Sequence, residues 1–148
     1  MSTDEAVAKD LIETLEDGKD GFAKGAEKLA DSDDPQLAST FRQFSEQRAR
    51  FAEELRRMGQ EYGDQIHESG SVAATLHRGW MSLKDALAGS DPDGVLDAAE
   101  QGEDHAVKEF EKALASDISQ GLRTLVERQF REVKAAHDEV KSLRDQHA

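Results

Sequence analysis

The chain has 148 residues, contains no cysteine, and carries 32 acidic against 19 basic side chains, for a formal net charge of −13. The lack of cysteine excludes disulfides, thiol catalysis and thiolate metal sites, and the acidic field repels nucleic acid and anionic membranes. Only 2 prolines, 5% aromatic residues and many strong helix formers favour an all-α protein forming a single domain over residues 1–148.

The first segment, MSTDEAVAKDLIETL, begins with the spacing of a capping box from Ser2 to Glu5, which predicts a helix over about residues 5–30. The segment has no basic region followed by an apolar one, so no signal peptide is expected. No apolar run in the chain approaches the roughly 20 residues of a membrane span. These features favour a soluble, cytoplasmic protein.

Two similar segments, LADSDDPQL and LAGSDPDGVL, carry helix start signals in the rest of the chain. Each places Asp directly before Pro, the order of a helix N-cap followed by the first helical position. We therefore predict helices over about residues 35–62 and 92–115. A last helix, opened by Ser116 or Asp117, is predicted over about residues 118–144.

The long connection between the second and third of these helices contains a shorter amphipathic helix, predicted over residues 71–88 and centred on Trp80. Some 17 helical residues span roughly 25 Å, close to the length of a bundle. Such a connection makes the helices on its two sides parallel, while the short links make the other consecutive helices antiparallel. This is the one-crossover topology of a ferritin-like four-helix bundle.

Each long helix carries an apolar stripe that a single polar residue interrupts near its middle. Distances along the sequence from the helix ends place the four residues within about one turn of each other, roughly 5 Å. We therefore predict one buried polar layer made of Lys19, Arg48, Glu103 and Gln129.

A buried cation must be paired, so Arg48 is expected to bind Glu103 through two parallel hydrogen bonds. Lys19 and Gln129 are expected to complete the network. Two cations and one carboxylate leave an excess of positive charge. A second nearby acid is therefore expected, supplied by Glu16, Glu100 or Glu132.

Five phrases carry a resemblance to a known family, namely DLIETLEDGKDGFAKGAEKL, SEQRARFAEEL, LHRGWMSLKDAL, EQGEDHAVKEFEKAL and AAHDEVKSLRD. Over about residues 7–145 the chain resembles a bacterial ferritin-like four-helix-bundle family of unknown function (domain of unknown function 2383). The resemblance implies a ferritin-like fold. It implies no activity, because the family has no assigned reaction and a fold alone does not supply one.

Metal-binding ferritin-like bundles take one Glu from each of two helices and Glu-x-x-His from each of the other two. None of the 5 histidines here has Glu three residues before it, and the first two helices offer Lys19 and Arg48 instead of ligands. The layer is therefore interpreted as an ion-pair network in place of a di-iron site. The alternative is a remodelled site for iron or another divalent metal, built from Glu103, Glu132, His105 and His137.

The function predicted from these features is that of a non-enzymatic bundle without a cofactor, which acts by binding a protein partner or by self-association. Gly18, Gly21 and Gly25 share one side of the first helix and indicate close helix approach or a homodimer contact. The alternative is a metal-binding or oxidoreductase protein with the remodelled site. A third hypothesis, an enzyme using Lys19 as base or Schiff-base nucleophile, is weakened because Glu103 nearby would keep the lysine protonated.

Overall fold

The computed structural model describes residues 3–30, 35–61 and 92–147. This part of the chain is all-α, with four helices and no strand: α1 (Thr3–Ala30), α2 (Pro35–Glu61), α4 (Pro92–Leu114) and α5 (Gln120–His147). The bounds lie within a few residues of those expected from the sequence. The helix expected over 71–88, with Trp80, and the capping residue Ser2 lie outside the described residues. None of the described helices combines the length and apolarity needed to cross a lipid bilayer.

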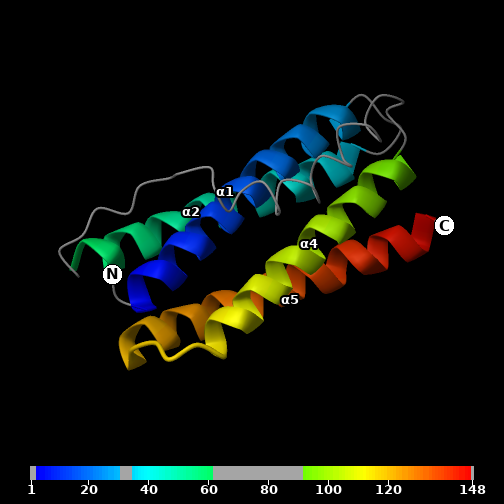
Figure 1. Cartoon of the computed structure of the whole chain (residues 1–148). Helices are drawn as coiled ribbons and strands as arrows, with labels where there is room; N and C mark the ends of the chain where they lie inside the picture. The colour runs from blue at the N-terminus through cyan, green and yellow to red at the C-terminus, as the bar shows by residue number, and fades with distance from the viewer. Residues whose placement is uncertain (1–2, 31–34, 62–91, 148) are drawn as a thin grey trace.

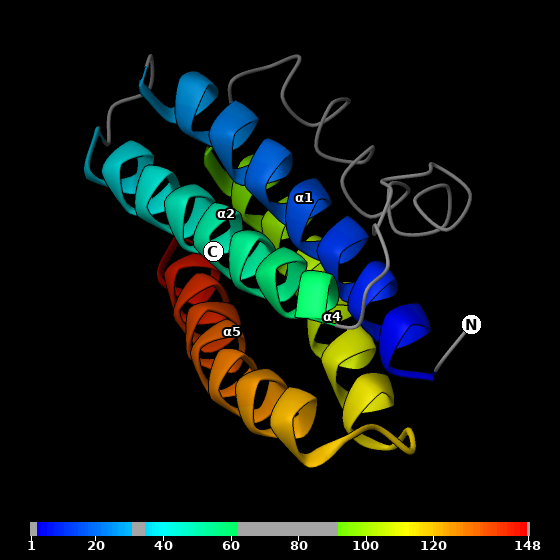
Figure 2. The same cartoon turned by 90° about the vertical axis from the view of Figure 1, so that its left-hand side faces the viewer.

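The four helices lie side by side as a bundle (Figure 1). α1 packs against α2 and α4, while α5 packs against α4 and, less closely, against α2. The colour gradient of Figure 1 shows that each helix runs antiparallel to these neighbours, and Figure 2 shows the α1–α2 pair against the α4–α5 pair. α2 and α4 are therefore diagonal helices that run in the same direction, which agrees with the predicted parallel order.

The turn between α4 and α5 is held by side chains that satisfy exposed backbone groups. Arg123 donates to the carbonyl oxygens of Leu114, at 2.8 Å, and Ser116, at 2.9 Å, both beyond the last helical hydrogen bonds of α4. The Ser119 hydroxyl accepts from the backbone N–H of Leu122 at 3.4 Å, the position of an N-cap. The last helix therefore begins at Gln120, later than predicted, because Ser119 rather than Ser116 caps it.

Two apolar clusters fill the bundle, one on each side of its middle. The first is built around the rings of Phe22, Phe41 and Phe44, with centroids 5.2 Å apart between Phe22 and each of the others. The second cluster consists mainly of aliphatic side chains and also buries the rings of Phe51 and Phe110. It occupies the half of the bundle that contains the α4–α5 turn. Between the two clusters the core holds charged and amide side chains, and this break locates the candidate site.

Candidate functional site

A buried ion pair joins the diagonal helices at mid-depth. Arg48 on α2 donates from Nη1 to Glu103 Oε1 at 2.6 Å and from Nη2 to Oε2 at 2.7 Å. The exposed fractions of the two residues are 1% and 0%. Two parallel hydrogen bonds between a guanidinium and a carboxylate are a strong and directional form of charge pairing. The long arginine side chain is suited to this place because it spans the distance between helices that are not direct neighbours.

Further contacts of the Arg48 side chain come from α1 and α2. The guanidinium carbon lies 5.3 Å from the centre of the Phe22 ring, within the range of a cation–π contact. A Cβ atom built on Gly18 would stand 3.4 Å from Nη1. The Nε–H donates to Gln47 Oε1 at 3.3 Å. Gly18 is therefore the α1 residue that faces the ion pair.

The placement of Lys19 in the buried layer was wrong. Its side chain is 37% exposed, and its Nζ pairs with Glu16 on the same helix at 2.8 Å. Glu16 also accepts from Arg56 of α2 at 2.8 Å, so this acid, one of three candidates for the balancing charge, serves a surface network. The physical reason is helical geometry, because Gly18 turns inward and the next residue is rotated by about 100°.

The protonation of Lys19 follows from this surface pairing. The hydrogen bond to Glu16 is the largest influence and raises the pKa of the lysine, and the charges of Glu16 and Asp20 act in the same direction. A lysine acting as a base or Schiff-base nucleophile needs a lowered pKa. The environment of Lys19 is therefore the opposite of what that chemistry requires.

Gln129 is fully buried but lies beside the ion pair rather than in it. Its Nε2 donates to the Phe51 carbonyl at 3.2 Å and to Glu54 Oε1 at 3.1 Å, and its Oε1 has no hydrogen-bond partner among the described residues. Phe51 is three residues beyond Arg48 on α2, about one helical turn away. This distance agrees with the predicted spread of the layer, which was about one turn.

The four residues of the alternative metal site are not brought together. Glu103 is held by Arg48, whereas Glu132 is exposed and its carboxylate lies 3.9 Å from Arg128. His105 is half-buried on α4. The imidazole of His137 contacts Asp104 and Asp138 instead. This set therefore does not form a common ligand sphere in the structure.

His137 forms a second polar cluster, at the contact between α4 and α5. Its Nε2 lies 2.6 Å from Asp104 Oδ1 and its Nδ1 lies 3.1 Å from Asp138 Oδ1. Burial lowers the pKa of His137, but the hydrogen bonds to Asp138 and Asp104 and the charges of Asp104 and Glu103 outweigh it, so the pKa is raised. The Glu100-x-x-x-Asp104 spacing, which places two carboxylates on one helix face, was the sequence signal that could have identified this cluster.

Comparison with known proteins identifies the family to which the chain belongs. A family model described as a domain of unknown function (DUF2383) matches residues 6–116, a stretch that includes both Arg48 and Glu103. No curated protein matches the chain. The chain therefore belongs to the DUF2383 family, whose function is unknown.

Proposed function

We propose that this protein is a bacterial, ferritin-like four-helix bundle without a di-iron centre. In this proposal it is a single-domain, cytoplasmic, non-enzymatic protein that acts by binding a protein partner or a second copy of itself. The observation that carries the proposal is the buried pair of Arg48 and Glu103, which fills the middle of the core with a charge arrangement of its own.

The residues at mid-depth do not fit two metal ions. A di-iron centre of a ferritin-like bundle needs four carboxylates and two histidines that project inward from four helices. Here the central carboxylate, Glu103, already has both oxygens engaged by a guanidinium. α1 faces the same space with Gly18 and Phe22, which have no ligand atoms in their side chains. A cation at this place would have to displace Arg48 from both oxygens of Glu103.

The helix directions support the ferritin-like part of the proposal. α2 ends at one end of the bundle and α4 begins at the other, so the two run parallel (Figure 1). Bundles with this order and one long crossover include the ferritin-like folds. A fold of this kind hosts many functions, so the topology by itself supports no activity, and the residues at mid-depth are what support the proposal of a bundle without a di-iron centre.

Iron loading tests the proposal. The metal-free chain is given Fe(II) without oxygen, then exposed to air, and the bound iron and the absorbance of oxidised di-iron are measured. The proposal predicts no such absorbance at two irons per chain. Two bound irons with that absorbance, both lost in Glu103→Gln but retained in the matched variant Glu132→Gln, would overturn it.

Sedimentation across a wide concentration range separates the two modes of action. A reversible dimer that dissociates on dilution supports self-association. A monomer at every concentration assigns the action to a different protein partner. An acidic chain of this charge is expected to associate more strongly as salt rises if its copies meet, because screening reduces their repulsion.

A further inference from the structure

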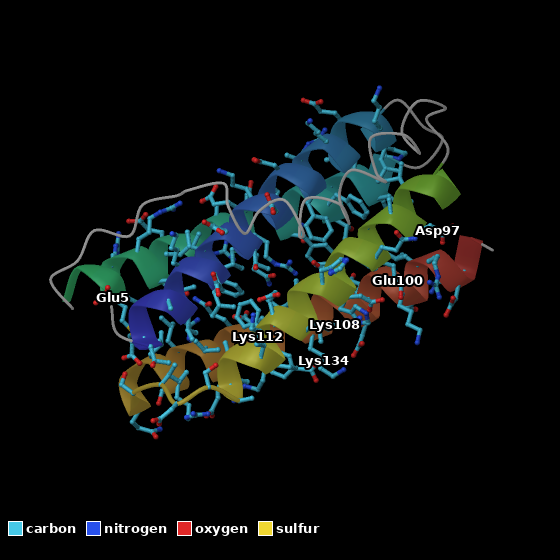
Figure 3. The ribbon with its side chains drawn as sticks, in the orientation of Figure 1. Glu5, Asp97, Glu100, Lys108, Lys112 and Lys134 are labelled. Carbon is cyan, nitrogen blue, oxygen red and sulfur yellow. The ribbon has the colours of Figure 1, made fainter. Side chains whose placement is uncertain are left out.

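The α4–α5 contact carries a set of metal-ligand groups that the central ion pair does not use. Glu100 and Asp104 lie on α4 and His137 lies on α5, and one potential ligand atom from each falls within 4.8 Å of the other two. All three residues are half-buried. Figure 3 shows Glu100 on the side of α4 that faces α5, with Asp97 one turn earlier. We infer that Glu100, Asp104 and His137 bind one divalent transition-metal ion of the Zn²⁺ type.

The backbone already supplies the spacing that such a site needs. Glu100 and Asp104 are four residues apart on α4, so they lie one above the other on the same face. α5 passes antiparallel beside that face and adds His137. Zn²⁺ bonds of about 2.0–2.2 Å place ligand atoms no more than about 4.4 Å apart. The observed spread of up to 4.8 Å exceeds this limit by only a few tenths of an ångström.

The donor set matches a borderline divalent cation. One imidazole and two carboxylates suit Zn²⁺ and its neighbours in the first transition series, whereas Mg²⁺ and Ca²⁺ prefer oxygen ligands throughout. Three protein ligands leave a fourth position that water fills, because the cluster is half-buried rather than sealed. The site would therefore be open to exchange with solvent.

Asp138 provides an independent indication, because it prepares His137 for this role from outside the cluster. Its carboxylate lies 3.1 Å from Nδ1, and a carboxylate that accepts the Nδ1–H directs the lone pair of Nε2 outward, as in carboxylate–histidine–zinc arrangements. Nε2 then points at Asp104, 2.6 Å away. A neutral imidazole has one N–H and cannot donate to both acids. When Nδ1–H is donated to Asp138, the space between Nε2 and Asp104 favours a cation, either a proton or a metal ion.

Arg144 is the competitor for the same ligands. Its Nη1 donates to Glu100 Oε2 at 2.8 Å, but Nη2 also contacts Asp145 at 3.2 Å. The partly exposed guanidinium can therefore keep a carboxylate partner when Glu100 turns to a metal. Lys134 and Lys141 on α5 also act on Asp138 through their charge. Metal affinity is thus set by competition between a bound ion and Arg144 for Glu100.

The proposed site shares no residue with the central ion pair, although the charge of Glu103 acts on His137. Glu103 points into the core toward Arg48, whereas its neighbour Asp104 is half-buried and points to α5. A metal held by Asp104 leaves the core pairing intact. The inference can therefore fail while the proposed function stands, and the reverse also holds, because the two sites depend on different residues.

Zn²⁺ binding to the full chain tests the inference. The chain is freed of metal with a chelator, and Zn²⁺ affinity is measured at mildly alkaline pH by competition with a chromogenic chelator. The expected result is one Zn²⁺ per chain in the unchanged protein. His137→Gln and Asp104→Asn are each expected to weaken binding at least tenfold. His105→Gln, which alters a histidine on α4 outside the cluster, is expected to have no effect.

Two further variants separate a built site from attraction to an acidic surface. Arg144→Gln is expected to tighten Zn²⁺ binding by releasing Glu100, whereas Arg131→Gln, an equal loss of charge at an exposed position of α5, is expected to change affinity much less. Circular dichroism verifies that each variant is folded, and Glu100→Gln replaces any variant that is not. No bound Zn²⁺ in the unchanged protein, or equal affinities in His137→Gln and His105→Gln, would overturn the inference.

Discussion

Arg48 and Glu103 bind each other across the diagonal of the bundle, from two parallel helices that are not direct neighbours. The pair divides the core into two apolar clusters. Burying two charges costs several kcal/mol per ion before their attraction is counted. The pair is therefore better understood as fixing the relative depth of α2 and α4 than as a large source of stability.

Removing one partner of the Arg48–Glu103 pair should strongly lower the free energy of unfolding. Arg48→Met leaves the Glu103 carboxylate buried without a counter-charge, and we expect the free energy of unfolding to fall by about 3–5 kcal/mol. Denaturant titration followed by circular dichroism measures the loss. Arg57→Met, which breaks an exposed pair with Glu53 on the same helix, serves as the control and should cost at most about 1 kcal/mol. Equal losses in the two variants would mean that Arg48 is effectively solvated.

Two glycines of α1 should respond in opposite directions to alanine. A Cβ on Gly25 would stand 2.7 Å from Cδ2 of the buried Phe41 ring, so Gly25→Ala forces the ring or α2 to move and should destabilise by about 1–3 kcal/mol. A Cβ on Gly18 would meet Arg48 at an ordinary 3.4 Å. Gly18→Ala should therefore be neutral or gain up to about 1 kcal/mol of helix propensity.

Thermal unfolding of the two alanine variants provides the comparison. Both remove a glycine from the same helix, so differences in the unfolded chain cancel to a large degree. A Gly25→Ala variant with the melting temperature of Gly18→Ala would show that α1 and α2 do not approach as closely as the structure has them.

The start of α5 can be tested with two serines. Ser119 accepts from the Leu122 N–H, and we expect Ser119→Ala to cost about 0.5–2 kcal/mol, the usual cost of losing an N-cap. Ser116 donates instead to the carbonyl of Lys112 at 3.0 Å, so Ser116→Ala should change stability by less. Urea unfolding of both variants measures the difference. A larger loss for Ser116→Ala would restore the earlier helix start that the sequence suggested.

The stability contributed by His137 should depend on pH. Its pKa is raised in the folded chain, so its contribution is complete below the unfolded pKa of about 6.5 and is lost as pH rises through the folded value. With a chelator present, the stability difference between the unchanged protein and His137→Gln should shrink from mildly acidic to alkaline pH. Denaturant midpoints over that range measure it, and a difference that grows with pH would contradict the pairing with Asp104 and Asp138.

Much of the fold could be predicted from the sequence because its signals are local. Asp-Pro phrases mark the starts of α2 and α4, and the apolar stripes mark the buried faces of all four described helices. The diagonal pairing of Arg48 with Glu103 was also predictable, because a cation in an apolar stripe requires a partner and only one carboxylate stood at the same depth.

Other features of the candidate site could not be predicted from the apolar stripes of the helices. The stripe of α1 predicts Lys19 at this depth because a glycine has no side chain that a hydrophobic periodicity can register, whereas in the structure Gly18 lies beside the guanidinium of Arg48. Gln129 is buried within about one turn of Arg48, as predicted, but its hydrogen bonds go to the Phe51 carbonyl and Glu54 rather than to the ion pair. The contact between His137 and Asp104 joins two helices at their boundary, where burial is partial and periodicity is weakest.

A double-mutant cycle on the core pair tests the central claim most directly. Unfolding free energies are measured for Arg48→Met, Glu103→Leu and the combined variant. Because paired apolar residues can replace a buried ion pair with little loss, the account predicts that the combined variant is more stable than Arg48→Met alone. A combined loss equal to the sum of the two single losses would contradict it, because it would mean that the two side chains act independently.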